Sequence, residues 1–246
     1  MITKLIVRGM LVGLLAGLFA GVFAYTVGEP RVDRAIALEE AAAASAGTGA
    51  HSHEAAEPAH SHGEEAPVSR NGQRFGLFLA LALYGLALGG LFALVYAGVR
   101  GRVGPRSEPL LAVSLAAAAF IAIVLIPFVK YPANPPAVGD PETINQRTVL
   151  YLVAVAIGIL SVGAAAAAHR YVSSEEAWPR WLAGGAALLV PVTAAWILLP
   201  GIDEVPEGFP AGLLWDFRLA SLGTQAVFWL GVGALFAFAA RRRSPA

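Results

Sequence analysis

Long apolar stretches alternate with short polar ones along the whole chain. Six of these stretches carry almost no charge, and each is long enough, at about 20 residues, to cross roughly 30 Å of hydrocarbon as a helix. They lie near residues 5–27, 75–98, 110–129, 148–168, 181–199 and 219–240. The pattern predicts an all-α integral membrane protein with about six transmembrane helices arranged as hairpins.

The composition supports this prediction and limits the chemistry. Of the 246 residues, 57% are hydrophobic and only 14% are charged, which is unlike a soluble domain with a charged surface. The chain has no cysteine, so disulfides are excluded, and a metal ion would have to bind imidazole, carboxylate, carbonyl or water rather than thiolate. We expect the partners to be the bilayer and other membrane subunits, with a homo-oligomer left open, and no nucleic acid.

The charges are distributed unevenly between the two sides of the predicted bundle. Ten of the seventeen Lys and Arg residues lie on the side of the two termini, whereas fourteen of the seventeen acids lie on the other side. By the positive-inside rule the N and C termini are cytoplasmic, in a multi-pass protein of a bacterial inner (plasma) membrane. The acidic outer side would raise the local concentration of cations.

The first span has two interpretations. Its basic start resembles a secretory signal peptide, whose cleavage would leave five spans. Against cleavage, glycines recur at every fourth position, which places a groove for a neighbouring helix on one face; these helix-packing residues are Gly9, Gly13, Gly17 and Gly21. We therefore expect the span to be retained.

Three regions follow from the pattern: a first helix over 1–27, an outer loop over 28–74 and a helical bundle over 75–246. Within the outer loop, residues 30–44 are expected to be helical. The remainder consists of Ala, Ser, Gly, Glu, His and Pro with almost no apolar bulk, so we expect it to be largely disordered without a ligand.

Four of the five histidines lie in that low-complexity part, as two His-Ser-His units. Neutral imidazole binds Co(II), Ni(II), Cu(II) and Zn(II), and two ligands at i and i+2 on a flexible chain can share one ion. The candidate metal ligands are His51, His53, His60 and His62. A solvated spacer or a pH-responsive segment is the alternative.

Two further outer loops, residues 130–147 and 200–218, combine proline turns with acids and amides. They could form a mouth for a cation, with oxygen ligands from Asn134, Asp140, Glu142, Asn145, Asp203, Glu204, Glu207 and Asp216. In the alternative interpretation the acids form interfacial ion pairs, for example Asp216 or Glu142 with an arginine, that only fix the loops.

Polar residues and prolines next to these loops are candidates for structural or gating roles. Arginines stand at the heads of two helices, one of which continues inward as a polar stripe, and two prolines should kink their spans. These residues are Arg147, Arg218, Ser221, Gln225, Pro127 and Pro191.

Several functions are excluded or disfavoured. The chain has no phosphate-binding loop, no charged residue at the centre of any span, and no nucleophile and base at a recognisable spacing. We predict that it is not an enzyme and holds no tightly bound cofactor. A non-transporting scaffold, or a metal or pH sensor acting through a partner, remains the alternative to transport.

The segment YPANPPAVGDPETI at 131–144, the segment DEVPEGFPAGLLWDFRLASLGTQ at 203–225, the histidine-rich loop and the glycine ladder resemble the CbtA family of cobalt transporter subunits. The resemblance extends over essentially the whole chain, although the family is usually described with five spans. It implies cobalt uptake linked to cobalamin biosynthesis, and a small single-span partner subunit, CbtB, with its own histidines. Co(II) would then be the transported metal, with Ni(II) or Zn(II) as alternatives.

The histidine-rich loop gives a direct prediction. A peptide covering residues 45–70 should bind Co(II) or Ni(II) at about pH 7.5, above the pKa of roughly 6.5 of free imidazole, and lose affinity as the histidines protonate. Isothermal titration calorimetry measures this binding. Absence of heat with both ions would rule out metal capture by the loop.

Overall fold

The computed structural model describes residues 2–48, 69–173 and 175–241 of the chain. Every regular element in these ranges is helical. Along the chain they are α1 (Ile2–Phe23), the π-helix η1 (Ala24–Gly28), α2 (Glu29–Thr48), α3 (Arg70–Val99), α4 (Glu108–Ala119), the π-helix η2 (Phe120–Leu125), α5 (Ile126–Lys130), the 3₁₀-helix η3 (Pro141–Thr143), α6 (Ile144–Tyr171), α7 (Ala177–Leu198) and α8 (Ala211–Arg241).

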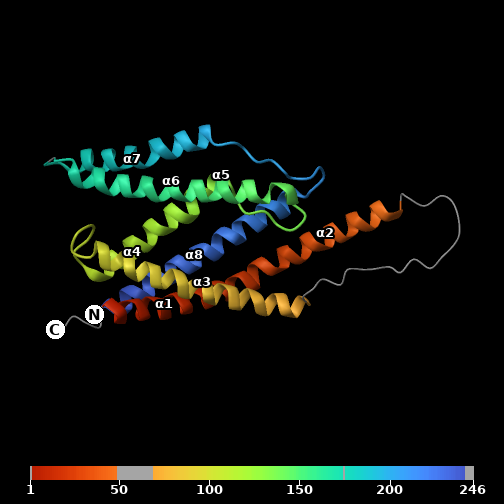
Figure 1. Ribbon diagram of the computed structural model, residues 1–246, viewed down its shortest axis with the longest axis horizontal. Coiled ribbons are helices and arrows are strands. Elements are labelled where there is room, and N and C mark those ends of the chain that lie inside the picture. Colours follow the sequence, from red (N-terminus) through yellow and green to blue (C-terminus); the bar gives the residue numbers. More distant parts are fainter. Residues whose placement is uncertain (1, 49–68, 174, 242–246) are drawn as a thin grey trace.

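Six helical segments of the described residues are long and apolar enough to cross a membrane, which confirms the predicted all-α membrane fold. The start of α1 and the end of α8 lie at the same end of the bundle (Figure 1). The third segment combines α4, η2 and α5 into one helix over Glu108–Lys130. Figure 1 shows α2 leaving the bundle as a long arm.

Two boundaries differ from the sequence-based expectation. The first span does not end at residue 27, because the helix continues through η1 into α2 and remains helical to Thr48. The next helix begins at Arg70 rather than at 75, with the side chain of Ser69 accepting a hydrogen bond from the Gly72 amide at 3.2 Å. Ion pairs hold α2 against this start: Arg70 and Arg74 each contact Glu29 and Asp33.

The closest packing in the molecule joins α1 to α3 through glycines on both helices. A Cβ atom added to Gly13 would lie 2.0 Å from the Gly85 carbonyl oxygen, and one added to Gly85 would lie 2.2 Å from the Gly13 oxygen. Gly9 and Gly89 oppose each other in the same way, at 2.3 and 2.1 Å. The two backbones therefore touch directly, as in helix pairs that associate through small residues in membranes.

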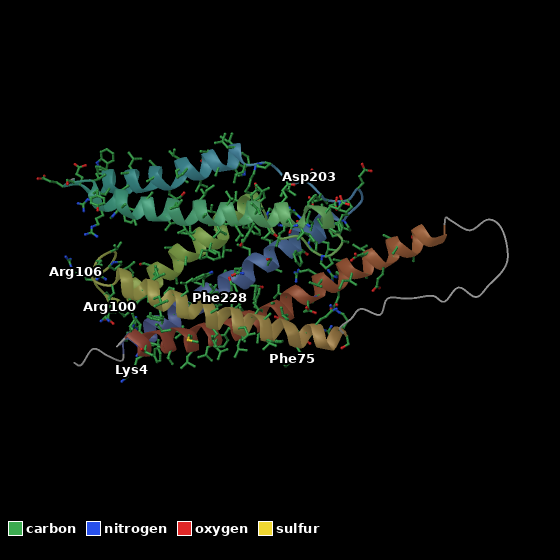
Figure 2. The ribbon with its side chains drawn as sticks, in the orientation of Figure 1. Lys4, Phe75, Arg100, Arg106, Asp203 and Phe228 are labelled. Atoms are coloured by element: carbon green, nitrogen blue, oxygen red, sulfur yellow. The ribbon has the colours of Figure 1, made fainter. Side chains whose placement is uncertain are left out.

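The core lies between this pair and the helices α4 and α8. Its largest fully buried side chains include Tyr96 from α3 and Phe228 and Phe236 from α8 (Phe228 is labelled in Figure 2). The ring centroids of Tyr96 and Phe236 are 4.8 Å apart, and those of Phe92 and Phe236 are 5.2 Å apart. Such aromatic contacts bury large surfaces and fix α8 against α3.

Pro127 explains the irregular η2 segment in the third span. Proline has no amide hydrogen, so it cannot bond the Ile123 carbonyl one turn earlier. The hydroxyl of Tyr151 on α6 donates to that oxygen instead, at 3.4 Å, and the helix widens so that the Ile126 amide bonds the Ile121 carbonyl. Beside it, Gly158 of α6 lets the Ala122 carbonyl approach, since a Cβ there would lie 2.1 Å from the oxygen. The bulge is thus the attachment point of α6.

Helices α6 and α7 form a hairpin beside the other spans (Figure 1). Helix α7 packs mainly against α6, whereas α8 packs against α1 and α4. Spans three and four, on either side of the first outer loop, therefore do not pack like spans five and six, on either side of the second. Pro191 lies inside α7, which stays helical from Ala177 to Leu198.

The glycine contact predicts opposite effects for one substitution at two places on α3. Gly85→Ala should lower the free energy of unfolding by about 1–3 kcal/mol, because the added methyl meets backbone that cannot move aside. Gly98→Ala is the matched control: that site has nothing within 4 Å, so the free energy should stay level or rise by up to about 1 kcal/mol from helix propensity. Denaturant unfolding in micelles measures both; equal effects would contradict the glycine contact.

Candidate functional site

The two proline-rich loops meet at one end of the bundle. The first loop, residues 131–140, follows α5, and the second loop, residues 199–210, follows α7; we call this end of the bundle the loop end. A cavity of about 770 Å³ lies between them, with walls from η2, α5, α6 and α8. Asp203 of the second loop marks this end in Figure 2, opposite Lys4, Arg100 and Arg106.

Glu204 of the second loop contacts the first loop, η3 and the start of α6. One carboxylate oxygen accepts the Thr143 hydroxyl at 2.7 Å, and the other accepts the Asp140 backbone amide at 2.9 Å. The second oxygen also lies 3.5 Å from the Nε of Arg147. Because only 17% of its side chain is exposed, Glu204 joins the two loops more than it faces solvent.

These contacts favour the charged form of Glu204. The pKa of the Glu204 carboxyl is lowered from the usual 4.5, first by the Thr143 hydrogen bond, then by the Asp140 amide and the positive charge of Arg147. A proton on this carboxylate would compete with the groups that join the loops.

Arg147 lies against a glycine that no other residue could replace without strain. Gly139 has a φ of +121°, and a Cβ there would lie 2.3 Å from the guanidinium of Arg147. The guanidinium also donates to the Asp140 carbonyl at 3.0 Å. The turn Gly139–Asp140 thus orients Arg147 toward Glu204.

Arg218 belongs to the first turns of α8 and contacts the first loop from the opposite wall. It donates to the side-chain oxygen of Asn134 at 2.9 Å. Asp203 is near enough to act on it electrostatically. Ser221 and Gln225 continue the same face of α8 along the cavity, and the Tyr84 hydroxyl reaches the Gln225 oxygen at 3.5 Å.

Lys130, at the end of α5, and Tyr131, in the first loop, contact α7 and the second loop. Lys130 donates to the Trp196 carbonyl at 2.9 Å and lies 5.5 Å from the centre of the Trp196 ring. The Tyr131 hydroxyl donates to the Pro200 carbonyl at 2.8 Å, and burial raises the pKa of this phenol. The α6–α7 hairpin is therefore held at the loops as well as at η2.

The structure brings together part of the predicted set. Seven predicted residues line the cavity: Asn134, Arg147, Asp203, Glu204, Arg218, Ser221 and Gln225. Five others are exposed and are not part of the lining: Asp140, Glu142, Asn145, Glu207 and Asp216. Pro127 is buried behind the cavity wall, and Pro191 lies in α7 away from it.

In these loops Glu204 forms the ion pair with an arginine, Arg147. The sequence had suggested Asp216 or Glu142 for this role. Among the described residues, no three His, Asp or Glu side chains come together to hold a metal ion. The predicted ligands His51, His53, His60 and His62 lie outside the described residues. The cavity thus offers few carboxylates to an ion.

Sequence reasoning missed several residues that shape the site. Lys130 and Tyr131 cross-link the loops, and Thr148 and Tyr151 line the cavity from α6. The adjacent proline turns marked these segments as turns. The hydroxyl-bearing residues and the lysine next to them follow no sequence pattern from which their contacts could be predicted.

The chain matches the family described as "probable cobalt transporter subunit (CbtA)" over residues 2–241. It belongs to the CbtA family. The family description supports a cobalt transporter subunit, which implies a partner protein and indicates a role other than catalysis. Among its described residues, six helices are long and apolar enough to cross a membrane, which together with the family indicates a multi-pass membrane protein. Comparison with curated proteins and with solved structures gave no match.

The contacts of Glu204 predict a pH-dependent link between the loops. Since the pKa is lowered in the folded chain, Glu204 stabilises it above the unfolded value of about 4.5, and this contribution is lost as the pH falls through the lower folded value. Glu204→Gln should therefore lower the melting temperature at about pH 7 and about pH 5, with a difference from wild type that shrinks below about pH 4.5. Glu207→Gln on the same loop is the control; a pH-independent difference would refute the link.

Proposed function

We propose that this CbtA protein is the membrane subunit of a divalent metal uptake system, and that the cavity at the loop end is its outer vestibule. The observation that carries the proposal is the cavity itself, formed where two loops far apart in sequence close over the bulge in the third span. A pocket of this size with convergent polar groups is a usual form of ligand site in proteins.

The orientation is part of the proposal. Lys4, Arg100 and Arg106 lie at the end opposite the loop end (Figure 2), which the positive-inside rule assigns to the cytoplasm. The termini would then be cytoplasmic and the cavity would face outward, in a bacterial inner membrane. The membrane potential would favour inward movement of a divalent ion.

Asp203 is the best candidate to attract the ion. It lines the cavity and is exposed, whereas Glu204 is occupied by Thr143, Asp140 and Arg147. Below it, Ser221 and Gln225 supply neutral oxygen atoms along α8. This arrangement suits passage better than tight holding, because a tightly bound ion would not leave.

The family description makes Co(II) the first choice of cargo, and Ni(II) or Zn(II) remain chemically acceptable. His51, His53, His60 and His62 would collect ions outside. A small single-span subunit of the CbtB type would complete the system, and a homo-oligomer is compatible with it. No resident cofactor is required.

A sensor or scaffold is the second candidate, and one observation favours it. Helix α2 is continuous with α1 through η1, and Arg70 and Arg74 fix its base to α3 through Glu29 and Asp33. A change in the outer segment could thus reach the glycine contact in the core without any metal crossing the membrane.

Cobalt uptake distinguishes the candidates. In cells expressing the chain with its partner, Asp203→Asn should slow cobalt uptake about fivefold, which corresponds to roughly 1 kcal/mol of lost attraction near water. Asp216→Asn removes the same charge outside the cavity lining and should leave uptake close to wild type. Equal rates for both variants would remove Asp203 from the path, and absence of cobalt accumulation in wild-type cells would favour the sensor.

A further inference from the structure

The charged side chains of the cavity carry more positive than negative charge. Lys130, Arg147 and Arg218 line it from three elements, against Asp203 and Glu204. A vestibule made only to attract a bare divalent cation would have the opposite balance, because like charges in a partly desolvated cavity repel strongly. The excess of arginine needs an explanation beyond the attraction of cations.

Two of the three cations are committed within the protein. Arg147 is paired with Glu204 and donates to the Asp140 carbonyl, and Lys130 is held by the carbonyl and ring of Trp196. The charge of Arg147 is thus compensated by a carboxylate, and the ammonium of Lys130 is directed to neutral groups of Trp196.

Arg218 is different. Its hydrogen-bond partner is the neutral amide of Asn134, and its Nε is buried without a hydrogen-bond partner. Asp203 acts on it electrostatically, and the two form no ion pair among the described residues. A guanidinium has five N–H donors in a planar fork, which matches two oxygens of a carboxylate. Arg218 therefore lines the cavity with a guanidinium whose charge no carboxylate of the described residues neutralises in a direct ion pair.

The rest of the lining suits an oxygen-rich organic anion. Ser221 and Gln225 on α8 add neutral hydrogen-bonding groups, whereas the hydroxyls of Thr148 and Tyr151 on α6 already donate to backbone carbonyls. The volume of about 770 Å³ falls in the range of pockets for small organic ligands, roughly 300–1,000 Å³.

We propose that the cavity binds a small polycarboxylate that chelates the metal, with one carboxylate on the fork of Arg218. Cobalt then enters the vestibule as a negatively charged chelate rather than as the bare ion. Asp203, across from Arg218, faces the metal side of the complex. This inference rests on the proposed function in metal uptake and names the form of its substrate.

The experiment uses the full chain in lipid nanodiscs, with the four histidines of residues 51–62 replaced by alanine so that they do not bind the metal. Calorimetry measures binding of four probes: citrate, Co(II) with equimolar citrate, Co(II) chloride and inorganic phosphate. Three variants are compared with this background: Arg218→Gln, Arg218→Lys and Arg34→Gln. Arg34 is the control because it is exposed on α2, outside the cavity lining.

The proposal expects Co(II) with citrate to bind at least tenfold more tightly than Co(II) chloride. Arg218→Gln should weaken the chelate at least tenfold and leave bare Co(II) unchanged or bound more tightly, because a repelling charge is gone. Arg218→Lys keeps the charge but loses the fork, so its affinity for the chelate should fall in between. Arg34→Gln should bind all probes as the background does. Weaker binding of one probe, with unchanged or tighter binding of the other, cannot arise from misfolding.

Three results would overturn the proposal. They are tighter binding of Co(II) chloride than of the chelate, equal loss of both in Arg218→Gln, and phosphate binding as tight as that of the chelate. If bare Co(II) still binds and is taken up by cells, the proposed function stands and only the chelate is refuted. If neither form of cobalt binds or accumulates, the proposed function fails as well.

Discussion

The backbone contact between α1 and α3 is the constraint from which the arrangement of the bundle follows. Lipid gives helices no hydrophobic reason to associate, so close van der Waals contact must hold them, and glycines at matching positions allow it. The pair then presents Tyr96 and Phe92 as one surface, on which the aromatic side chains of α8 pack. Helix α8 in turn positions α4. The bulge η2, which follows α4 in the third span, positions α6.

The bulge illustrates how a membrane protein satisfies an irregular backbone. An unpaired carbonyl would be costly in hydrocarbon, and the Ile123 carbonyl, to which Pro127 cannot donate, accepts the Tyr151 hydroxyl from a different helix. The same tyrosine lines the cavity. Tyr151 therefore serves both the backbone of the bulge and the lining of the candidate site. Above the bulge, contacts of Glu204, Lys130 and Tyr131 join the two loops and the α6–α7 hairpin.

The apolar pattern predicted the spans because burial in hydrocarbon requires long uncharged helices whatever their partners are. The glycine ladder on α1 was recognised from its regular four-residue spacing. Its partners on α3, Gly85 and Gly89, were not identified from the sequence. The cavity depended on contacts that sequence distance conceals: Glu204 and Thr143 are 61 residues apart. The sequence did not distinguish the acids of these loops. In the structure Glu204 joins the loops, Asp203 lines the cavity without joining them, and the others lie outside the lining. Only the backbone path of the loops separates them.

The electrostatics of the two outer features can be complementary. Acids on the outer side raise the concentration of all cations near the protein, so they cannot by themselves distinguish one metal from another. An arginine in the cavity acts on a different property, the net charge of the species that enters. Hydrated ions common to every medium would be repelled by Arg218, while a metal carried by a carboxylate ligand would be attracted to it. Selection by the ligand in addition to the ion would give a scarce metal an advantage that the intrinsic affinity order of divalent ions does not provide.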